Sequence, residues 1–98
     1  MPRVSRNRDR CRTGHLCSRT APVIAKQGSV FANGKALLTR GSRVAPHLIK
    51  KGIYCVPHAA KMTGSSRSVF AEGIGVGRRG DRADRGAMTG ASQNVFAG

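Results

Sequence analysis

The chain has few of the residues from which a large hydrophobic core is built. Its 98 residues include no tryptophan, one tyrosine and three phenylalanines. No apolar run reaches the ~18–20 residues of a membrane-spanning helix, and the arginine-rich start lacks the apolar segment of a secretory signal. These absences predict one small domain, made in the cytoplasm, that needs a disulfide, a metal or a partner to be stable.

Acidic residues are also scarce. The chain has four aspartates and glutamates against 18 lysines and arginines, which gives a net charge of +14. The acidic residues lie mostly in predicted turns, and neither a glycine-rich phosphate loop nor a nucleophile elbow is present. The sequence therefore does not predict an enzyme.

The positive charge is concentrated near the start of the chain and again over residues 78–85. Such a charge is typical of proteins that bind nucleic acid. However, modules that bind single strands carry stacking aromatics among their basic residues, and neither cluster has one. A basic surface that is merely solvated, or that faces an anionic protein, agrees equally well with the charge.

A short block of sequence is repeated. Residues 29–34 read SVFANG, residues 68–73 read SVFAEG, and residues 94–98 read NVFAG. The first two copies are followed at the same offset by RGS over residues 40–42 and RGD over residues 79–81. An internal repeat of this kind predicts three similar units with pseudo-threefold symmetry, whose phenylalanines meet around one axis.

The local pattern is that of an all-β protein. Thirteen glycines favour many tight turns and exclude long helices. Asn33-Gly34 predicts a hairpin, because both central residues of a type I′ turn need a positive φ. The one competing helix, over residues 43–52, is interrupted by Pro46 and Gly52. The predicted strands are residues 22–25, 28–31, 35–39, 53–56 and 69–71, with Pro57 ending the fourth, and the main loops are residues 1–20 and 41–49.

All three histidines lie in loop-like segments that also contain cysteine, glycine or proline. His15 forms an H-x-C pair with Cys17, and His58 ends a C-x-x-H segment that begins at Cys55. Together with His47, these side chains offer the imidazole and thiolate ligands of tetrahedral zinc. We therefore expect a metal site.

Two alternatives exist for the cysteines. One is a disulfide among Cys11, Cys17 and Cys55, which a reducing cytoplasm disfavours. The other is a catalytic Cys–His pair, for which the surrounding sequence offers no supporting motif.

The chain resembles the PAAR-repeat family, the cone-shaped proteins at the tip of the central spike of contractile injection machines. It is most similar to the small PAAR proteins of T4-like phage baseplates. The resemblance covers a single domain over residues 8–98, which leaves residues 1–7 as a basic N-terminal arm. It rests on three segments that contain the histidines: TGHxC over residues 13–17, PHxI over residues 46–49 and CxPHxA over residues 55–60. It also rests on residues 64–70, 79–81 and 86–89, and on the final block at residues 94–98.

The resemblance implies a small pyramid of β-structure with a metal at its apex and a trimeric β-helical spike protein at its base, one copy per trimer. One structural zinc would be held by three histidines and one cysteine: His15, His47 and His58, with Cys55 as the fourth ligand and Cys17 as the alternative. The base would consist of the repeated Val–Phe pairs, Val30, Phe31, Val69, Phe70, Val95 and Phe96.

The implied function is that of a structural part of the virion, at the tip of the tail baseplate, that sharpens the spike for piercing and contacts the target envelope. Specific nucleic-acid binding and stable membrane insertion are not expected. The alternative is a basic zinc-binding module that binds nucleic acid. A base with three similar units is useful to a spike tip that docks on a trimer, whereas a nucleic-acid-binding module has no need for one.

The sequence departs from the family in three ways. The Pro-Ala-Ala-Arg signature is absent, and the expected Gly-Asp is Arg8-Asp9 in the first copy and Gly41-Ser42 in the second. We expect these changes to weaken the turns at two corners. The charge of +14 is not a family property, and it suits acidic baseplate partners or an anionic cell surface.

Overall fold

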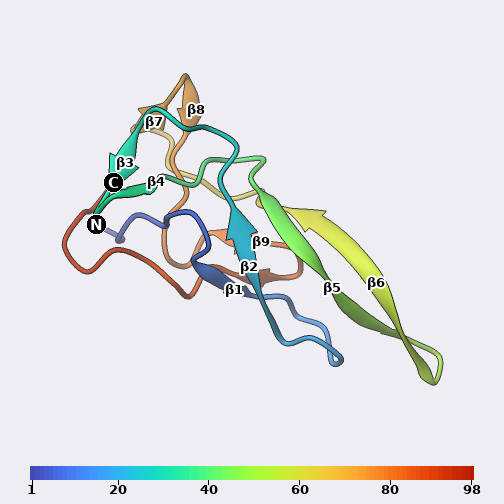
Figure 1. The fold of residues 1–98 in the computed structure, drawn as a ribbon. Helices are drawn as coiled ribbons and strands as arrows, with labels where there is room; N and C mark the ends of the chain where they lie inside the picture. Colours follow the sequence, from blue (N-terminus) through green and yellow to red (C-terminus); the bar gives the residue numbers. More distant parts are fainter.

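The computed structural model describes residues 1–98 and contains only β-strands, turns and loops, which confirms the all-β prediction (Figure 1). Its longest dimension is 42 Å against 22 Å in the other two directions. No helix that could cross a membrane is present. The strands are β1 (Arg10–Arg12), β2 (Thr20–Ile24), β3 (Phe31–Ala32), β4 (Lys35–Ala36), β5 (Arg43–Lys51), β6 (Tyr54–Lys61), β7 (Phe70–Ala71), β8 (Ile74–Gly75), β9 (Arg82–Ala83) and β10 (Gly86–Ala87).

Four strands form one antiparallel sheet in the order β1-β2-β5-β6, and the other six form three small hairpins. In the β3–β4 hairpin, Asn33 and Gly34 have φ values of 55° and 76°. Glu72 and Gly73 of the β7–β8 hairpin have nearly the same values, 51° and 77°. The predicted Asn-Gly hairpin is therefore confirmed. Glu-Gly adopts the same turn, in which Gly73 takes its positive φ without strain while Glu72 holds a conformation that is uncommon for its residue type.

The third copy of the repeat pairs with the start of the chain. Arg3 lies opposite Phe96 in an antiparallel bridge, and the two chain ends lie side by side near β3 (Figure 1). Val4 and Ser5 are fully buried. Residues 3–6 are therefore an integral part of the fold, which corrects the expectation of an N-terminal arm over residues 1–7. The valine of each repeat block accepts an equivalent backbone hydrogen bond at its carbonyl. Leu37 N–H donates to Val30 at 2.9 Å, Val76 N–H to Val69 at 3.0 Å, and Val4 N–H to Val95 at 2.9 Å.

Three backbone hydrogen bonds join these segments in a closed ring. Ser5 N–H donates to the Gly77 carbonyl at 2.9 Å, and Gly77 N–H donates to the Leu38 carbonyl at 2.7 Å. Leu38 N–H closes the ring by donating to the Ser5 carbonyl at 3.0 Å. Each segment thus contacts both of the others through the same pair of backbone groups.

The turns that follow the ring are all capped in the same way. Backbone N–H groups of Arg6 and Arg78 donate to Asp9 and Asp81 at 2.7 and 2.8 Å. In the second copy, Thr39 N–H donates to the Ser42 hydroxyl at 3.0 Å. The cap is therefore retained at Arg8-Asp9, although Arg8 adopts a φ of 69° where the other two corners have Gly41 and Gly80, both at 89°. A non-glycine residue is strained at such a φ, so the expected weakening of this corner stays a prediction. The Ser42 corner lacks only the arginine–aspartate ion pair, which the other two corners form at 3.1 and 3.0 Å.

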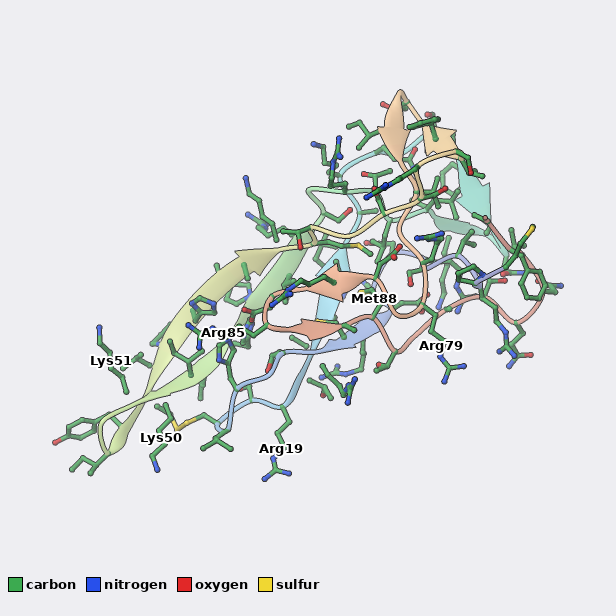
Figure 2. The ribbon with its side chains drawn as sticks, turned by 180° about the vertical axis from the view of Figure 1, so that it is seen from behind. Arg19, Lys50, Lys51, Arg79, Arg85 and Met88 are labelled. Carbon is green, nitrogen blue, oxygen red and sulfur yellow. A yellow bond between two sulfur atoms is a disulfide. The ribbon has the colours of Figure 1, made fainter.

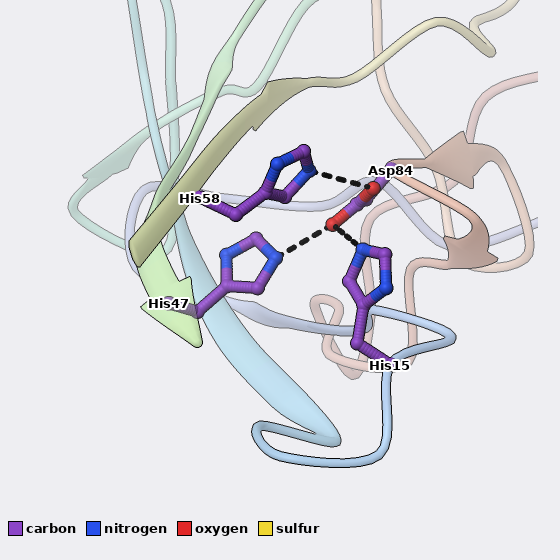
Figure 3. A group of neighbouring side chains, drawn as sticks. All are labelled: His15, His47, His58 and Asp84. Atoms are coloured by element: carbon purple, nitrogen blue, oxygen red, sulfur yellow. Dashed lines mark hydrogen bonds and ion pairs between the residues drawn. The ribbon is translucent and has the colours of Figure 1, made fainter. Parts of the chain in front are cut away.

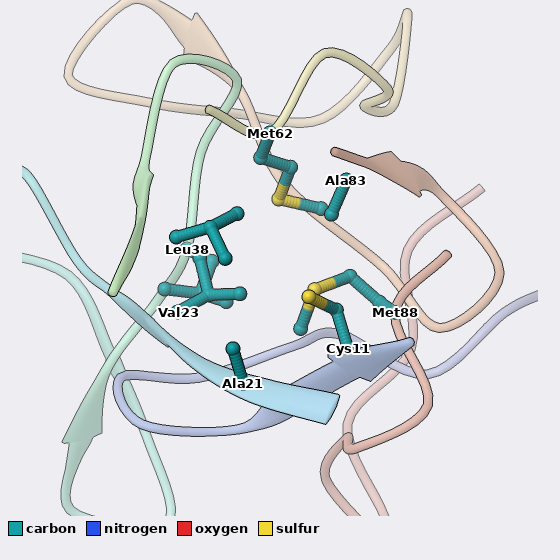
Figure 4. Close-up of a cluster of buried hydrophobic side chains, with 8 residues drawn as sticks. Cys11, Ala21, Val23, Leu38, Met62, Ala83 and Met88 are labelled. Carbon is teal, nitrogen blue, oxygen red and sulfur yellow. The ribbon is translucent and has the colours of Figure 1, made fainter. Parts of the chain in front are cut away.

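Two hydrophobic clusters fill the interior. The alanines that follow the repeated phenylalanines are buried, while the phenylalanines point outward. Small side chains therefore fill the interior of the repeat units and the phenylalanines lie at the surface, while the prediction that their rings meet around one axis stays a prediction. One cluster contains Val4, Ala32, Leu37, Ala71, Val76 and Ala97. The other contains Cys11, Ala21, Val23, Leu38, Val44, Met62, Ala83 and Met88 (Figure 4).

The β5–β6 hairpin is much longer than predicted. Residues 41–49 were expected to form a loop and Pro57 to end a strand, yet β5 and β6 pair through both prolines. Pro46 lies where the register between the strands shifts, so its missing N–H breaks no regular bond. Opposite Pro57, the backbone N–H and carbonyl of Leu48 bond to Ser18 at 3.0 and 3.1 Å. The Leu48–Pro57 pair therefore needs no hydrogen-bond donor from the backbone of the proline.

Candidate metal centre

Three imidazoles and one carboxylate meet beside the β5–β6 hairpin. The side chains belong to His15, His47, His58 and Asp84, and their ligand atoms all lie within 4.8 Å of one another (Figure 3). Asp84 Oδ2 is 3.0 Å from His15 Nε2 and 2.6 Å from His47 Nε2. Asp84 Oδ1 is 3.5 Å from His58 Nε2. The structure thus brings together the three predicted histidines, although they lie far apart in sequence.

Two of the histidines are placed by strand pairing. His47 on β5 and His58 on β6 are direct cross-strand partners. Opposite residues of an antiparallel pair point to the same face of the sheet, close enough for their side chains to touch. Their ring centroids are 5.2 Å apart.

The other two ligand candidates are held by a loop that packs on a turn. His15 follows β1, and Asp84 lies in the two-residue turn between β9 and β10. Arg85 N–H donates to the Thr13 carbonyl at 3.2 Å. Gly14 has a φ of 78°, and a Cβ there would lie only 2.8 Å from Cβ of Arg85. Glycine therefore permits both the conformation and the close approach that bring His15 to Asp84.

Asp84 itself adopts a φ of 54°, a left-handed conformation that aspartate and asparagine accept more readily than most residues. Its side chain is only 5% exposed. Burial alone would raise the pKa of this carboxyl. Hydrogen bonds and charges from His15 and His47 outweigh the burial, so the pKa of Asp84 lies below its usual value. The carboxylate is therefore ionised at neutral pH.

The hydrogen bonds of His47 define how its ring is protonated. Nδ1 lies 2.8 Å from the Ala45 carbonyl, which can only accept, so Nδ1 carries a proton. In the neutral ring, Nε2 then presents a lone pair toward the Asp84 carboxylate, and the two repel. A cation between them, either a second proton or a metal ion, removes this conflict. Ligating histidines commonly donate their other N–H to a backbone carbonyl in this way.

The separations suit a metal ion. Zinc–nitrogen bonds of 2.0–2.1 Å in a tetrahedron place the ligand atoms about 3.3 Å apart. The distances from Asp84 to the three imidazole nitrogens, 2.6 to 3.5 Å, lie on both sides of that value. The group of three histidines and Asp84 could therefore hold a metal ion.

The prediction of a cysteine as the fourth ligand is wrong in this structure. Cys17 and Cys55 form a disulfide with a Cα–Cα distance of 6.0 Å, so neither offers a thiolate. The physical reason lies in the strand: Cys55 and His58 are three residues apart on β6, and such residues point to opposite faces. A C-x-x-H segment can chelate one ion only where the chain turns.

A disulfide among the cysteines was the alternative to a metal-bound thiolate, and it was considered the weaker one because a reducing cytoplasm disfavours disulfides. The structure contains such a disulfide. It joins the loop of His15 to the strand of His58. The remaining thiol, Cys11, is buried in the core, and burial raises its pKa. Cys11 is therefore a core residue and not a ligand.

Asp84 was missed in the sequence. One signal could have found it: Asp84 is one of only four acidic residues in a strongly basic chain. It also lies three residues after Gly80-Asp81 and beside Arg85. In the structure a carboxylate, and not a thiolate, completes the group with the three histidines.

The predicted partner-binding residues lie at the opposite end of the molecule. Phe31, Phe70 and Phe96 are 56%, 56% and 48% exposed. Val30 and Val69 are also exposed, and Val95 is half-buried. The chain thus presents three similar Val–Phe pairs to solvent.

The three repeat blocks also contact one another in pairs. The Ser29 hydroxyl donates to the Glu72 carboxylate at 2.5 Å, which joins the first block to the second. The Asn33 side-chain amide donates to the Asn94 side chain at 2.9 Å, and the Ser68 hydroxyl donates to the Gly98 carbonyl at 3.2 Å. These bonds join the third block to the first and to the second.

Neither a protein-family model nor a curated protein sequence matches this chain.

Proposed function

We propose that this protein is the structural tip of the central spike of a contractile tail, at the phage baseplate, where one copy caps one trimer of a β-helical spike protein. One observation carries the proposal: three similar Val–Phe units are exposed at one end of a single chain and are linked to one another in pairs. A single chain can meet a threefold axis only if it offers three similar contacts.

The backbone supports a pseudo-threefold pyramid over this base. The closed ring through Ser5, Leu38 and Gly77 repeats one hydrogen bond three times, and the capped turns after it repeat another. The open end of a β-helix exposes unpaired strand edges, which invite aggregation unless they are covered. Docking would therefore stabilise both partners.

At the other end, we propose that His15, His47, His58 and Asp84 hold one structural zinc ion. Zinc accepts imidazole and carboxylate ligands in tetrahedral sites. The ligands come from the loop after β1, the β5–β6 hairpin and the β9–β10 turn, so one ion would tie three separate segments at the narrow end of the molecule. This role is structural, and we propose no catalytic activity.

The proposal is tested by binding to a purified trimeric β-helical spike protein. Replacing the exposed Phe31 and Phe70 by serine removes two of the three apolar contacts and leaves the buried core intact. We expect spike binding to fall at least about tenfold, since two large apolar contacts are lost. Ile53→Ser, which replaces an even more exposed apolar residue far from the Val–Phe pairs, is the control and should bind normally. Equal binding by the Phe31→Ser/Phe70→Ser variant would contradict the proposed base.

A further inference from the structure

The end of the β5–β6 hairpin exposes apolar side chains that no part of the chain covers. Ile53 is 87% exposed and Tyr54 is 69% exposed, and both lie where the hairpin turns. Leu16 and Leu48, at the same end of the molecule, are exposed as well. These are large apolar groups on a protruding hairpin, with none of the three-part pattern found at the base.

Positive charges surround these apolar groups. Lys50 and Lys51 lie beside Ile53 near the turn and extend into solvent (Figure 2). Next to His15 and Leu16, a pocket of about 550 Å³ is lined by the guanidinium-bearing residues Arg12, Arg19 and Arg85. None of these three side chains forms a hydrogen bond or an ion pair within the protein, unlike Arg6 and Arg78, which pair with aspartates.

No acidic side chain offsets this charge. Asp9 and Asp81 are engaged by arginines in the capped turns. Glu72 lies in the β7–β8 turn at the other end of the molecule, and the Asp84 carboxylate is enclosed by histidines. The hairpin end therefore presents unpaired cations around an apolar point.

We propose that this end of the molecule binds the surface of an anionic phospholipid bilayer. Ile53 and Tyr54 enter the interface between headgroups and acyl chains, Lys50 and Lys51 contact lipid phosphates, and the arginine pocket accepts a further phosphate. Tyrosine favours this depth because its ring is apolar and its hydroxyl stays wet. Lysines and arginines near an anionic membrane are each attracted to it, and their effects add.

The inference rests on the proposed function in one respect: docking of the opposite end on a spike leaves the hairpin end free to meet a membrane. The phosphates of a nucleic acid would neutralise these lysines and arginines equally well. It would have no use for Ile53, an exposed aliphatic side chain at the leading point, and Tyr54 is the only aromatic available for stacking there. The combination of charge and apolar exposure favours lipid.

The test uses the whole chain with vesicles of phosphatidylcholine alone or mixed with phosphatidylglycerol, at physiological salt. Tyr54 is the only tyrosine and there is no tryptophan, so the intrinsic fluorescence reports directly on the hairpin end. We expect binding to anionic vesicles only, with quenching of Tyr54 by brominated acyl chains. Binding without such quenching, or equal binding to neutral vesicles, would overturn the proposal.

Three variants separate the contributions. Lys50→Gln/Lys51→Gln should weaken binding about tenfold or more. Lys35→Gln/Arg79→Gln removes the same charge at the other end and should bind within about twofold of the original. Ile53→Ser should bind more weakly, with the tyrosine signal still readable. If the two double variants lose binding equally, or if Ile53→Ser binds normally, the hairpin is not the contact.

Two further arms identify the ligand. Inorganic phosphate at the concentration of accessible lipid phosphate, with ionic strength held constant, should not release the protein from vesicles. Release would indicate a site for small anions instead. Duplex DNA should bind more weakly than anionic vesicles, and tighter DNA binding that is lost in Lys50→Gln/Lys51→Gln would assign this surface to nucleic acid. None of these results depends on spike binding, which the hairpin variants should retain.

Discussion

The Nε2 atom of His47 lies 2.6 Å from Oδ2 of Asp84, in a cluster where both side chains are almost fully buried. The other ring nitrogen of His47 already donates to the Ala45 carbonyl. A neutral His47 would therefore turn a lone pair toward a carboxylate. A cation between them, either a second proton or a metal ion, would remove this conflict, and His15 and His58 could supply further ligands for a metal ion.

The first prediction concerns this metal. Purified protein should contain about one zinc per chain, because the four ligand candidates form one tetrahedral set. Removal by a chelator should lower Tm by about 10 °C or more, since metal binding in small domains is coupled to folding and 1 kcal/mol shifts Tm by roughly 4–8 °C. Elemental analysis and calorimetry measure both quantities, and added zinc should restore the original Tm. Metal-free protein with an unchanged Tm would rule out the site.

The second prediction concerns the fourth ligand. Asp84→Asn keeps the shape and tolerates the positive φ, but it removes the charge and the carboxylate. Loss of a residue that only supports a ligand typically costs 10–100-fold in metal affinity, so loss of a ligand should cost more than about 100-fold. Competition with a chromophoric chelator measures the affinity.

Glu72→Gln is the control for this variant, because it makes the same change of charge in an exposed turn of similar φ. Its zinc affinity should equal that of the unmodified protein. Equal affinities for Asp84→Asn and Glu72→Gln would show that Asp84 is not a ligand.

The third prediction concerns the disulfide. Cys17 and Cys55 are 38 residues apart, and closing such a loop stabilises a fold by about 4 kcal/mol in the chain-entropy treatment. A metal that joins His15 to His58 closes nearly the same loop. The Cys17→Ser/Cys55→Ser variant should therefore lose most of this stability in metal-free protein and clearly less in zinc-loaded protein.

Denaturant unfolding of both proteins, with and without zinc, completes a thermodynamic cycle. A loss that is the same with and without zinc would mean that the metal does not connect these two segments. Zinc content of the double serine variant should remain about one per chain, because neither cysteine contacts the histidine cluster.

Much of the fold could be predicted because it depends on local chemistry. Asn33-Gly34 determines its hairpin through backbone conformation alone, and the repeated block identifies the three exposed Val–Phe pairs. The positions of the aromatics were predicted less well. Three phenylalanines at one place in the repeat predicted rings that meet around one axis, but the sequence did not show that the following alanines, and not the rings, would fill the interior.

The metal centre could be predicted only in part, because it depends on contacts between distant segments. Imidazoles are rare in this chain, so their grouping was a usable signal. The roles of Asp84 and Cys55 depend on the β5–β6 hairpin, whose length is hidden in the sequence by Pro46 and Pro57. Once His58 lies within a strand, Cys55 must face away from it, and the fourth member of the histidine cluster is a carboxylate from the β9–β10 turn.

The central claim is that one chain caps one spike trimer, and the mass of the reconstituted complex tests it most directly. The chain has a mass of 10.4 kDa. Native mass spectrometry of the trimeric β-helical spike protein, mixed with an excess of this chain, should give a complex that is heavier than the trimer by one chain mass. A variant that lacks residues 94–98 and with them one of the three units should not form this complex. A complex heavier by three chain masses would contradict the account, because each spike chain would then bind its own copy and the three Val–Phe units would have no common axis to meet.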